Sequence, residues 1–273
     1  MKVTIIGCGY VGTAVARLWQ GRDDVAVTAT TTTPDRVLSL EAIASQVAIA
    51  KGNNAEALKS VLRDREVILL TVGARGGTYE ETYLETARTL VSLLPEFPSI
   101  RQLIYTGSYA VYGDRGGEWV DESSPVAPAN EKGEVLAETE GVLLAAARET
   151  LKVCVLRLGG IYGEGRELVR IFGRAAGMTR PGDGSDTSNW IHLDDIVGAI
   201  DFAVRHQLEG IYNLVDDSHL TTEKLIAGVL EANGLPPVTW DGSQSSSRSY
   251  NAKVSNQKLK DAGYQFIRPQ IKF

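Results

Sequence analysis

Apolar residues in the first part of the chain fall into short, β-branched runs that alternate with longer stretches of helix-forming residues. The runs have the length of strands buried on both faces, and they are Val3–Ile6, Val25–Thr30, Val47–Ala50, Val67–Val72 and Gln102–Thr106. Between them we expect helices at Thr13–Trp19, Pro34–Ala44, Ala55–Arg63 and Tyr79–Leu94. This alternation predicts an α/β fold built on a doubly wound parallel sheet, whose ligands bind at the carboxyl ends of the strands.

The first strand ends in three glycines with G-x-G-x-x-G spacing, and a helical stretch follows at once. In a dinucleotide-binding turn the first glycine permits the tight turn, the second lets the backbone approach a pyrophosphate, and the third lets the helix pack against the strand. The helix N-terminus then directs N–H groups and a partial positive charge at the phosphates. We therefore predict a bound dinucleotide, contacted by Gly7, Gly9, Tyr10, Val11 and Gly12.

The end of the second strand decides the type of cofactor. A carboxylate at this position bonds the ribose hydroxyls of NAD, but Asp23 and Asp24 precede the strand, and its end carries Thr30 and Thr31, with Arg36 shortly after. Hydroxyls and a guanidinium suit an additional 2′-phosphate, so we predict NADP, with NAD as the alternative. The competing interpretation is that the threonines only end the strand and cap the next helix, and that the arginine is a solvated charge.

Two further loops should reach the same edge of the sheet. Asn53 follows the third strand, where its amide could contact the adenine edge, although a turn-forming asparagine is the ordinary alternative. The fourth strand continues into a glycine-rich loop, residues 73–77, which we expect to be flexible. We expect Val72, Gly73 and Ala74 to line the cofactor there.

Composition narrows the class of protein. The formal net charge of −6 argues against a nucleic-acid-binding surface, and the hydrophobic content of 43% is ordinary for a soluble globular protein. No stretch reaches the roughly 18 apolar residues of a membrane span. The two cysteines, Cys8 and Cys154, are too few for a disulfide framework, and no His/Cys/Asp cluster has the spacing of a metal site. We expect a cytoplasmic protein that binds neither nucleic acid nor membrane nor metal.

Five motifs in the rest of the chain resemble those of the NAD-dependent epimerase/dehydratase family, the extended short-chain dehydrogenase/reductases. The first two, in family order, are Tyr105–Gly113, which is similar to S-x-x-V-Y-G, and the acidic-proline segment Asp121–Pro125. The third is Leu156–Gly163, which is similar to L-R-x-x-x-x-Y-G. The fourth combines Gly182–Gly184 (G-D-G) with Trp190–Asp195 (similar to H-V-D-D), and the fifth combines Ser255–Leu259 with Gly263–Tyr264. The resemblance covers nearly the whole chain. It implies a Rossmann-type sheet with a smaller C-terminal substrate domain.

The resemblance also locates the catalytic residues. Members of the family use a Ser or Thr together with a Tyr-x-x-x-Lys pair, in which the Tyr shuttles the proton and the Lys holds the ribose. Ser108 takes the first role, but Lys132 stands at the Tyr position and Leu136 at the Lys position, so the chain resembles an atypical subgroup. Lys132 could donate the proton if burial disfavoured its charged form. The alternative is that it pairs with Glu131 or Glu134 on a solvated helix face.

Two other residues are of types that could carry chemistry. Tyr109, in a loop expected to rim the cofactor, is a further candidate for the missing acid. His192 invites interpretation as a general base, but its position beside Asp194 and Asp195 at the start of a helix favours a structural or capping role.

We expect two domains. Residues 1–158 together with 190–209 should form the dinucleotide-binding domain, with Trp190–Gln207 as a helix on the sheet, and residues 159–189 together with 210–273 the small substrate-binding domain.

The substrate side offers weaker signals. Four arginines at near-helical spacing either grip a diphosphate or form an ordinary polar face, and they are Arg166, Arg170, Arg174 and Arg180. Ser243–Ser249 has the composition of a mobile surface loop that could act as a lid. By analogy with the family, the helices expected at Tyr79–Leu94 and Lys132–Thr150 could form a homodimer.

The sequence as a whole favours an oxidoreductase or epimerase that acts on a nucleotide-sugar-like or other small polar substrate. In that function Ser108 would orient the substrate, and Lys132 or water would handle the proton. A non-catalytic NADP-binding, redox-sensing module is the alternative, because such a protein would keep the glycine turn and tolerate Leu136.

Overall fold

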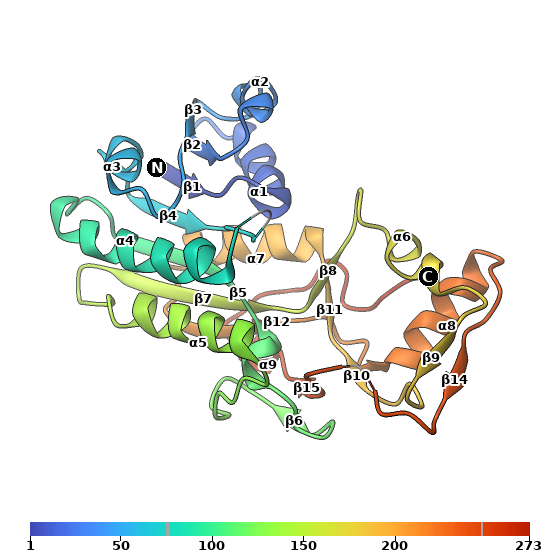
Figure 1. The fold of residues 1–273 in the computed structure, drawn as a ribbon. Helices are drawn as coiled ribbons and strands as arrows, with labels where there is room; N and C mark the ends of the chain where they lie inside the picture. Colours follow the sequence, from blue (N-terminus) through green and yellow to red (C-terminus); the bar gives the residue numbers. More distant parts are fainter. Residues whose placement is uncertain (75–76, 247) are drawn as a thin grey trace. The chain divides into compact units, whose positions relative to one another are not determined.

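Seven strands form one sheet in the computed structural model, which describes residues 1–74, 77–246 and 248–273 (Figure 1). Their order is β12-β7-β5-β4-β1-β2-β3. The bounds are β1 Lys2–Ile6, β2 Ala26–Thr31, β3 Gln46–Ile49, β4 Val67–Leu70, β5 Gln102–Ser108, β7 Lys152–Leu158 and β12 Gly210–Leu214. The direction of chain progression reverses between β1 and β4, which is the switch point of a doubly wound sheet. The predicted Rossmann-type fold is therefore confirmed.

Strand register brings the ends of the central strands to one level. β1 pairs in parallel with β2 and with β4, and β4 pairs in parallel with β5. Ile6 lies opposite Leu70, and Leu70 lies opposite Tyr105. Because carboxyl ends of parallel strands meet at one edge, the loops after β1, β4 and β5 leave the sheet side by side.

Helices cover both faces of the sheet. The main helices are α1 Tyr10–Gln20, α2 Val37–Glu41, α3 Ala55–Leu62, α4 Glu85–Leu93, α5 Glu131–Leu144 and α7 Leu193–Arg205. Short turns of other helical types are η1 Pro34–Arg36, the π-helical η2 Glu80–Leu84, η3 Leu94–Glu96, η4 Tyr109–Tyr112 and η5 Gly173–Ala175. On one face Trp19 of α1 donates its indole N–H to Asp201 of α7 at 2.9 Å.

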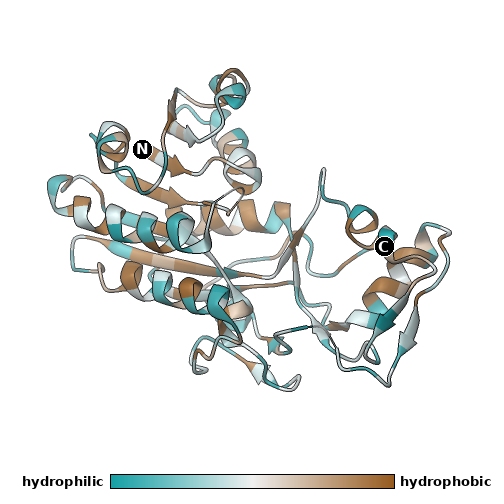
Figure 2. Ribbon diagram, viewed as in Figure 1, coloured by the Kyte–Doolittle hydropathy of each residue, from teal (hydrophilic) through white to brown (hydrophobic). Residues whose placement is uncertain are grey.

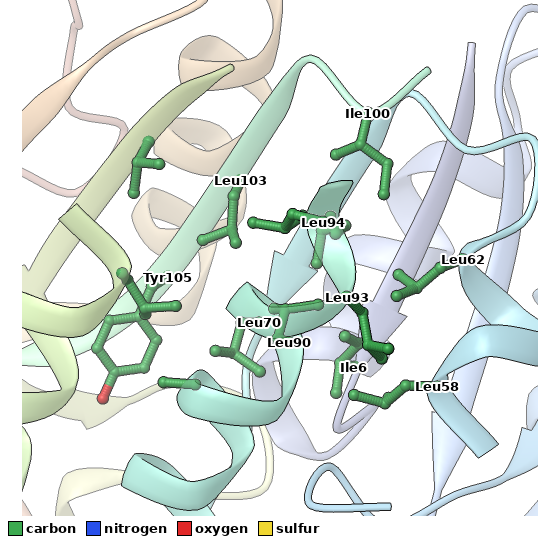
Figure 3. Close-up of a cluster of buried hydrophobic side chains, with 14 of the residues drawn as sticks. Ile6, Leu58, Leu62, Leu70, Leu90, Leu93, Leu94, Ile100, Leu103 and Tyr105 are labelled. Carbon is green, nitrogen blue, oxygen red and sulfur yellow. The ribbon is translucent and has the colours of Figure 1, made fainter. Parts of the chain in front are cut away.

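The core on the other face joins α3, α4 and α5 to the central strands (Figure 3). Its buried side chains include Ile6, Leu58, Leu62, Leu70, Leu90, Leu93, Leu103, Tyr105 and Leu143. Burial of each large apolar side chain contributes roughly 1.5–3 kcal/mol. Figure 2 shows the central strands as hydrophobic and the helices as mixed, as expected for strands covered on both faces.

Several predicted helices differ from those observed, among them Tyr79–Leu94, which is the π-helical η2 followed by α4. Trp190–His192, expected to begin a helix, instead forms β11, which pairs in parallel with β8 (Gly160–Tyr162), and α7 begins at Leu193. The helix expected at Lys132–Thr150 ends at Leu144, and that expected at Pro34–Ala44 is the short turn η1 followed by α2.

The chain divides into two compact units. Unit 1 comprises residues 1–108, 134–157 and 197–212, and unit 2 comprises residues 109–133, 158–196 and 213–273. The expected domains differ from this division chiefly in residues 109–133, which were expected in the dinucleotide-binding domain.

The described residues of unit 2 form short paired strands and short helices. The strand pairs are β6 (Trp119–Val120) with β15 (Lys253–Val254), β9 (Thr179–Pro181) with β14 (Thr239–Asp241), and β10 (Thr187–Ser188) with β13 (Leu220–Thr221), besides β8 with β11. The helices are α6 Leu168–Phe172, α8 Thr222–Ala232 and α9 Gln257–Asp261. Over the described parts of the chain, no helix is both long and apolar enough to cross a membrane.

Candidate cofactor-binding and active site

The glycine turn between β1 and α1 has the shape that a dinucleotide needs. Gly7 has φ +81°, and a Cβ placed on it would lie 2.8 Å from the Cα of Val72. A Cβ on Gly12 would lie 2.8 Å from Thr71 Oγ1, so α1 can approach the sheet this closely only through a glycine. At Gly9 the nearest atom to such a Cβ is the Gly7 carbonyl oxygen at 3.8 Å, which leaves room for a phosphate.

Hydrogen bonds from two neighbouring strands brace this turn. Gly7 donates its N–H to Thr30 Oγ1 at 3.0 Å, and Cys8 donates its N–H to the Thr30 carbonyl at 2.8 Å. From the other side, Thr71 donates its hydroxyl to the Gly7 carbonyl at 2.8 Å. The turn is therefore held in a fixed shape that a ligand does not have to impose.

The start of α1 suits an anion. Gly9 is the N-cap residue, no side chain of the described residues is recorded as capping the helix, and its first turn carries no acidic residue. Tyr10 and Val11, two of the predicted cofactor contacts, begin the helix, with Tyr10 half-buried and Val11 buried. Backbone N–H groups at a helix N-terminus and the positive end of the helix dipole favour a pyrophosphate here. The residues present thus fit the phosphates of a dinucleotide.

Arg36 lies across the glycine turn. Its Nη1 donates to the Cys8 carbonyl at 2.7 Å, and its Nη2 donates to Thr13 Oγ1 at 2.9 Å. Thr31 is buried, and its Oγ1 accepts the N–H of Thr33 at 3.1 Å. The guanidinium is thus fixed beside the end of β2, whereas the Thr31 hydroxyl is used within its own loop.

Polar residues near the ends of β2 and β3 have other partners. Asn53 is exposed and donates its amide to Glu85 Oε2 of α4 at 3.1 Å. Asn54 caps α3 by accepting the N–H of Ala57 at 3.0 Å. Asp35 lies exposed in η1, directly before Arg36, and the sequence analysis did not consider it.

The segment 72–74 forms the described start of the loop after β4. Gly73 is exposed, and apart from its chain neighbours no atom of the described residues lies within 4 Å of the position of a Cβ. The N–H of Ala74 donates to Tyr83 Oη at 3.4 Å. Residues 75–76 of the expected flexible loop lie outside the described residues.

The residues proposed for catalysis occupy different units. Ser108 is the last residue of β5, is half-buried and belongs to unit 1. Lys132 lies in the first turn of α5, belongs to unit 2 and is exposed. Lys132 is therefore not in the buried environment that the sequence analysis required of a proton donor. Leu136 is buried, and its hydrocarbon side chain can make no hydrogen bond to a ribose.

A buried ion pair that sequence reasoning missed lies one helical turn beyond Leu136. Arg157 of β7 donates Nε and Nη2 to Glu140 Oε2 at 3.0 and 2.8 Å, and both side chains are almost fully buried. Burial raises the pKa of Glu140, and its hydrogen bond from Arg157 partly offsets this. A Cβ on Gly107 would lie 2.9 Å from Glu140 Oε1. The signal in the sequence was an arginine within an otherwise apolar strand.

Tyr105 projects from β5 into the hydrophobic core between the central strands and α3, α4 and α5 (Figure 3). Its hydroxyl is buried and has no hydrogen-bond partner among the described residues. Burial raises its pKa well above the ordinary value, and the nearby charge of Glu140 adds to this.

In unit 2 the candidate tyrosines have structural partners. Tyr109 is buried, and its Oη accepts a hydrogen bond from Arg248 Nη2 at 2.7 Å. Its ring packs edge-on against Tyr250 with centroids 5.3 Å apart, and burial raises its pKa. Tyr112 donates its hydroxyl to Asn213 Oδ1 at 2.8 Å.

The histidine motif serves to anchor chain segments. His192 Nδ1 accepts the N–H of Asp194 at 3.0 Å where α7 begins. Asp195 accepts the hydroxyl of Tyr264 and the backbone N–H groups of residues 267–268. These contacts agree with the expected structural role.

The four arginines of the substrate side do not share one helix face, because α6 spans only Leu168–Phe172. Arg170 pairs with Glu167 at 2.9 Å, Arg174 lies in η5, and the Arg180 guanidinium lies 6.0 Å from the centre of the Trp240 ring. Their spacing of about four residues is therefore not that of one helix, and a contact with a diphosphate stays a prediction.

The described parts of the loop expected as a lid carry several side-chain hydrogen bonds. Ser243 donates its N–H to Asp241 Oδ1 at 3.1 Å, Ser246 donates its hydroxyl to Asp186, and Arg248 donates Nη1 to Thr222 Oγ1 at 3.0 Å. Residue 247 lies outside the described residues.

Comparison with known proteins gives the family. The NAD dependent epimerase/dehydratase family matches residues 3–214. The chain belongs to this family. It is 31% identical over 261 residues to Protein YeeZ of Escherichia coli (strain K12), covering 90% of this chain and 89% of that protein. It is 28% identical over 213 residues to dTDP-6-deoxy-L-talose 4-dehydrogenase (NAD(P)(+)) of Kitasatospora kifunensis, covering 70% and 67% respectively.

A solved structure shows the same fold. UDP-glucose 4-epimerase of Thermus thermophilus, in complex with NAD, is 21% identical and has a TM-score of 0.79, covering 100% of this chain and 95% of that chain. The resemblance to the epimerase/dehydratase family is thus confirmed. The family is NAD-dependent by description, and that neighbour holds NAD.

Proposed function

We propose that the chain is an NAD(P)-dependent oxidoreductase or epimerase that acts on a nucleotide-sugar-like or other small polar substrate. The observation that carries this proposal is the braced glycine turn, with space for a phosphate at Gly9, where α1 begins. The names of the relatives support the substrate class, because one acts on a dTDP-linked deoxy sugar and another on UDP-glucose.

Within this function Ser108, at the end of β5, orients the reacting oxygen of the substrate through its hydroxyl. The cofactor, when bound, accepts or supplies a hydride at its nicotinamide ring. The proton on the substrate oxygen is exchanged with Lys132 or with water. Because Leu136 stands at the Lys position, the ribose of the cofactor lacks the lysine contact that typical members of the family use.

We further propose that the cofactor is NADP. A guanidinium has five N–H groups, and the two hydrogen bonds from Arg36 to the glycine turn use two of them, which leaves three for an anion. The side chain is thereby positioned in advance beside the end of β2, where the 2′-phosphate of NADP lies in folds of this type. Thr30 helps to hold the turn by accepting the N–H of Gly7.

Substitution of Arg36 tests the cofactor preference. Hydrogen bonds to a charged group contribute about 1.5–3 kcal/mol, which corresponds to roughly 10- to 150-fold in affinity. We expect Arg36→Ala to lower the preference for NADPH over NADH by about this factor, because loss of the brace weakens both cofactors but loss of the phosphate contact weakens only NADPH. Arg36→Lys, which keeps the charge, should retain part of the preference. An unchanged ratio of dissociation constants in Arg36→Ala would overturn the NADP proposal.

A further inference from the structure

A tyrosine that belongs to no recognised motif lies at the carboxyl end of β4. Residues Glu80–Leu84 form a π-helical turn before α4. Such turns are rare, occur mostly singly, and are frequent at functional sites. The turn carries Tyr83, which is half-buried and whose ring centroid lies 5.1 Å from that of Tyr79. Burial raises the pKa of Tyr83, so its hydroxyl keeps its proton at neutral pH.

The hydroxyl of Tyr83 fixes the chain just beyond β4. Its oxygen accepts the N–H of Ala74 at 3.4 Å. A hydroxyl can donate one hydrogen bond as well as accept, so this contact does not use the phenolic proton. The start of the segment is also fixed, because Val72 packs against Gly7 closely enough to exclude a Cβ there. The segment 72–74 is thus held by the glycine turn at one end and by Tyr83 at the other.

Strand order identifies the part of the cofactor that this segment faces. A doubly wound sheet binds one half of a dinucleotide over each half of the sheet, on either side of the switch point between β1 and β4. The adenosine half belongs over β1, β2 and β3, so the nicotinamide half belongs over β4 and β5. Leu70, the last residue of β4, lies opposite Tyr105 of β5, so the segment 72–74 begins just beyond β4 on the side where β5 runs on to Ser108.

We propose that Tyr83 is a positioning residue for the nicotinamide half of the cofactor. Its oxygen holds Ala74 so that the segment 72–74 keeps its position against that half. Its O–H donates to the nicotinamide ribose, which Leu136 on α5 cannot do. This inference rests on the proposed function, because it requires that a dinucleotide binds the glycine turn.

Two variants and two ligands test the proposal. Tyr83→Phe removes only the hydroxyl and keeps the ring that packs in the turn, and Tyr79→Phe is the matched control beside the same turn. NADPH reports both halves of the site, whereas 2′,5′-ADP reports the adenosine half alone. We expect Tyr83→Phe to weaken NADPH about three- to tenfold, the effect of one or two lost hydrogen bonds, and to leave 2′,5′-ADP within about twofold. Tyr79→Phe should change neither.

Failure of the role given to Tyr83 and failure of the proposed function give different results. If Tyr83→Phe leaves NADPH binding unchanged, or weakens both ligands equally, or if Tyr79→Phe has the same effect, the role of Tyr83 is overturned while the proposed function stands. If the wild-type protein binds neither NADPH nor NADH, the proposed function fails first, and the role of Tyr83 fails with it.

Discussion

Replacement of Asp216 with asparagine should change the pH dependence of stability. Asp216 follows β12 in unit 2, is only 4% exposed, and accepts the N–H of Ser218 at 2.9 Å through Oδ1. Its Oδ2 is buried without a hydrogen-bond partner in the described parts of the chain. Burial, with smaller contributions from Asp217 and Asp195, raises the pKa of Asp216 to about 7.

The size of the effect follows from linkage. An aspartate titrates near 3.9 in the unfolded chain, and each pKa unit is worth 1.36 kcal/mol, so ionisation of Asp216 costs the folded protein about 4 kcal/mol. Between about pH 4 and pH 7 the folded state binds this proton and the unfolded state does not. The free energy of unfolding therefore falls as pH rises through this window, by roughly 1.4 kcal/mol per unit, and the loss is complete above pH 7.

Asp216→Asn abolishes this proton linkage but leaves an amide without a partner, at a cost of about 1–3 kcal/mol. The variant should be less stable than wild type by that amount near pH 4 and more stable by about 1–3 kcal/mol at pH 8. Urea unfolding at both pH values measures the difference. Asp183→Asn is the control in the same unit, because Asp183 is exposed and accepts the N–H of Ser185 at 2.9 Å, so its replacement should give no gain at pH 8. A stability difference for Asp216→Asn that does not vary with pH would refute the reasoning.

Two further substitutions separate folding from function. Gly9→Ala should lower NADPH affinity by roughly tenfold or more, because the added methyl group enters the space near the Gly7 carbonyl that a phosphate would occupy. Gly21→Ala should leave both stability and affinity unchanged, and normal NADPH binding by Gly9→Ala would contradict the phosphate assignment. If the exposed Lys132 is the proton donor, Lys132→Ala should abolish turnover without loss of cofactor affinity. Steady-state kinetics measures turnover and NADPH titration measures affinity, and unchanged turnover would assign the proton transfer to water.

Local patterns predicted the sheet and the glycine turn well. The runs Val3–Ile6 and Val67–Val72 are largely apolar, as strands covered on both faces must be, and Gly7 and Gly12 stand where no Cβ fits. These features depend on neighbours in sequence, so a single chain displays them. The helix predicted at Trp190–Gln207 failed in its first three residues because a short apolar run fits a strand as well as a helix, and only its pairing with Gly160–Tyr162 decides the matter.

The missed features depend on contacts between distant segments. Glu140 and Arg157 are polar residues that become a buried pair only when α5 packs on β7. Tyr83 faces Ala74 from a π-helical turn, which no spacing rule for an α-helix anticipates. Dimerisation through α4 and α5 stays a prediction, as do the cofactor contacts expected of Thr31 and Asn53, whose side chains have partners within the protein.

A titration of the purified wild-type protein with NADPH and with NADH, followed by nicotinamide fluorescence, tests the central claim most directly. The braced turn at Gly7, the open space at Gly9 and the fixed guanidinium of Arg36 predict saturable binding of both, with NADPH at least tenfold tighter. A preference for NADH would contradict the role given to Arg36 and leave the turn as the binding site. Binding of neither cofactor would contradict the account itself.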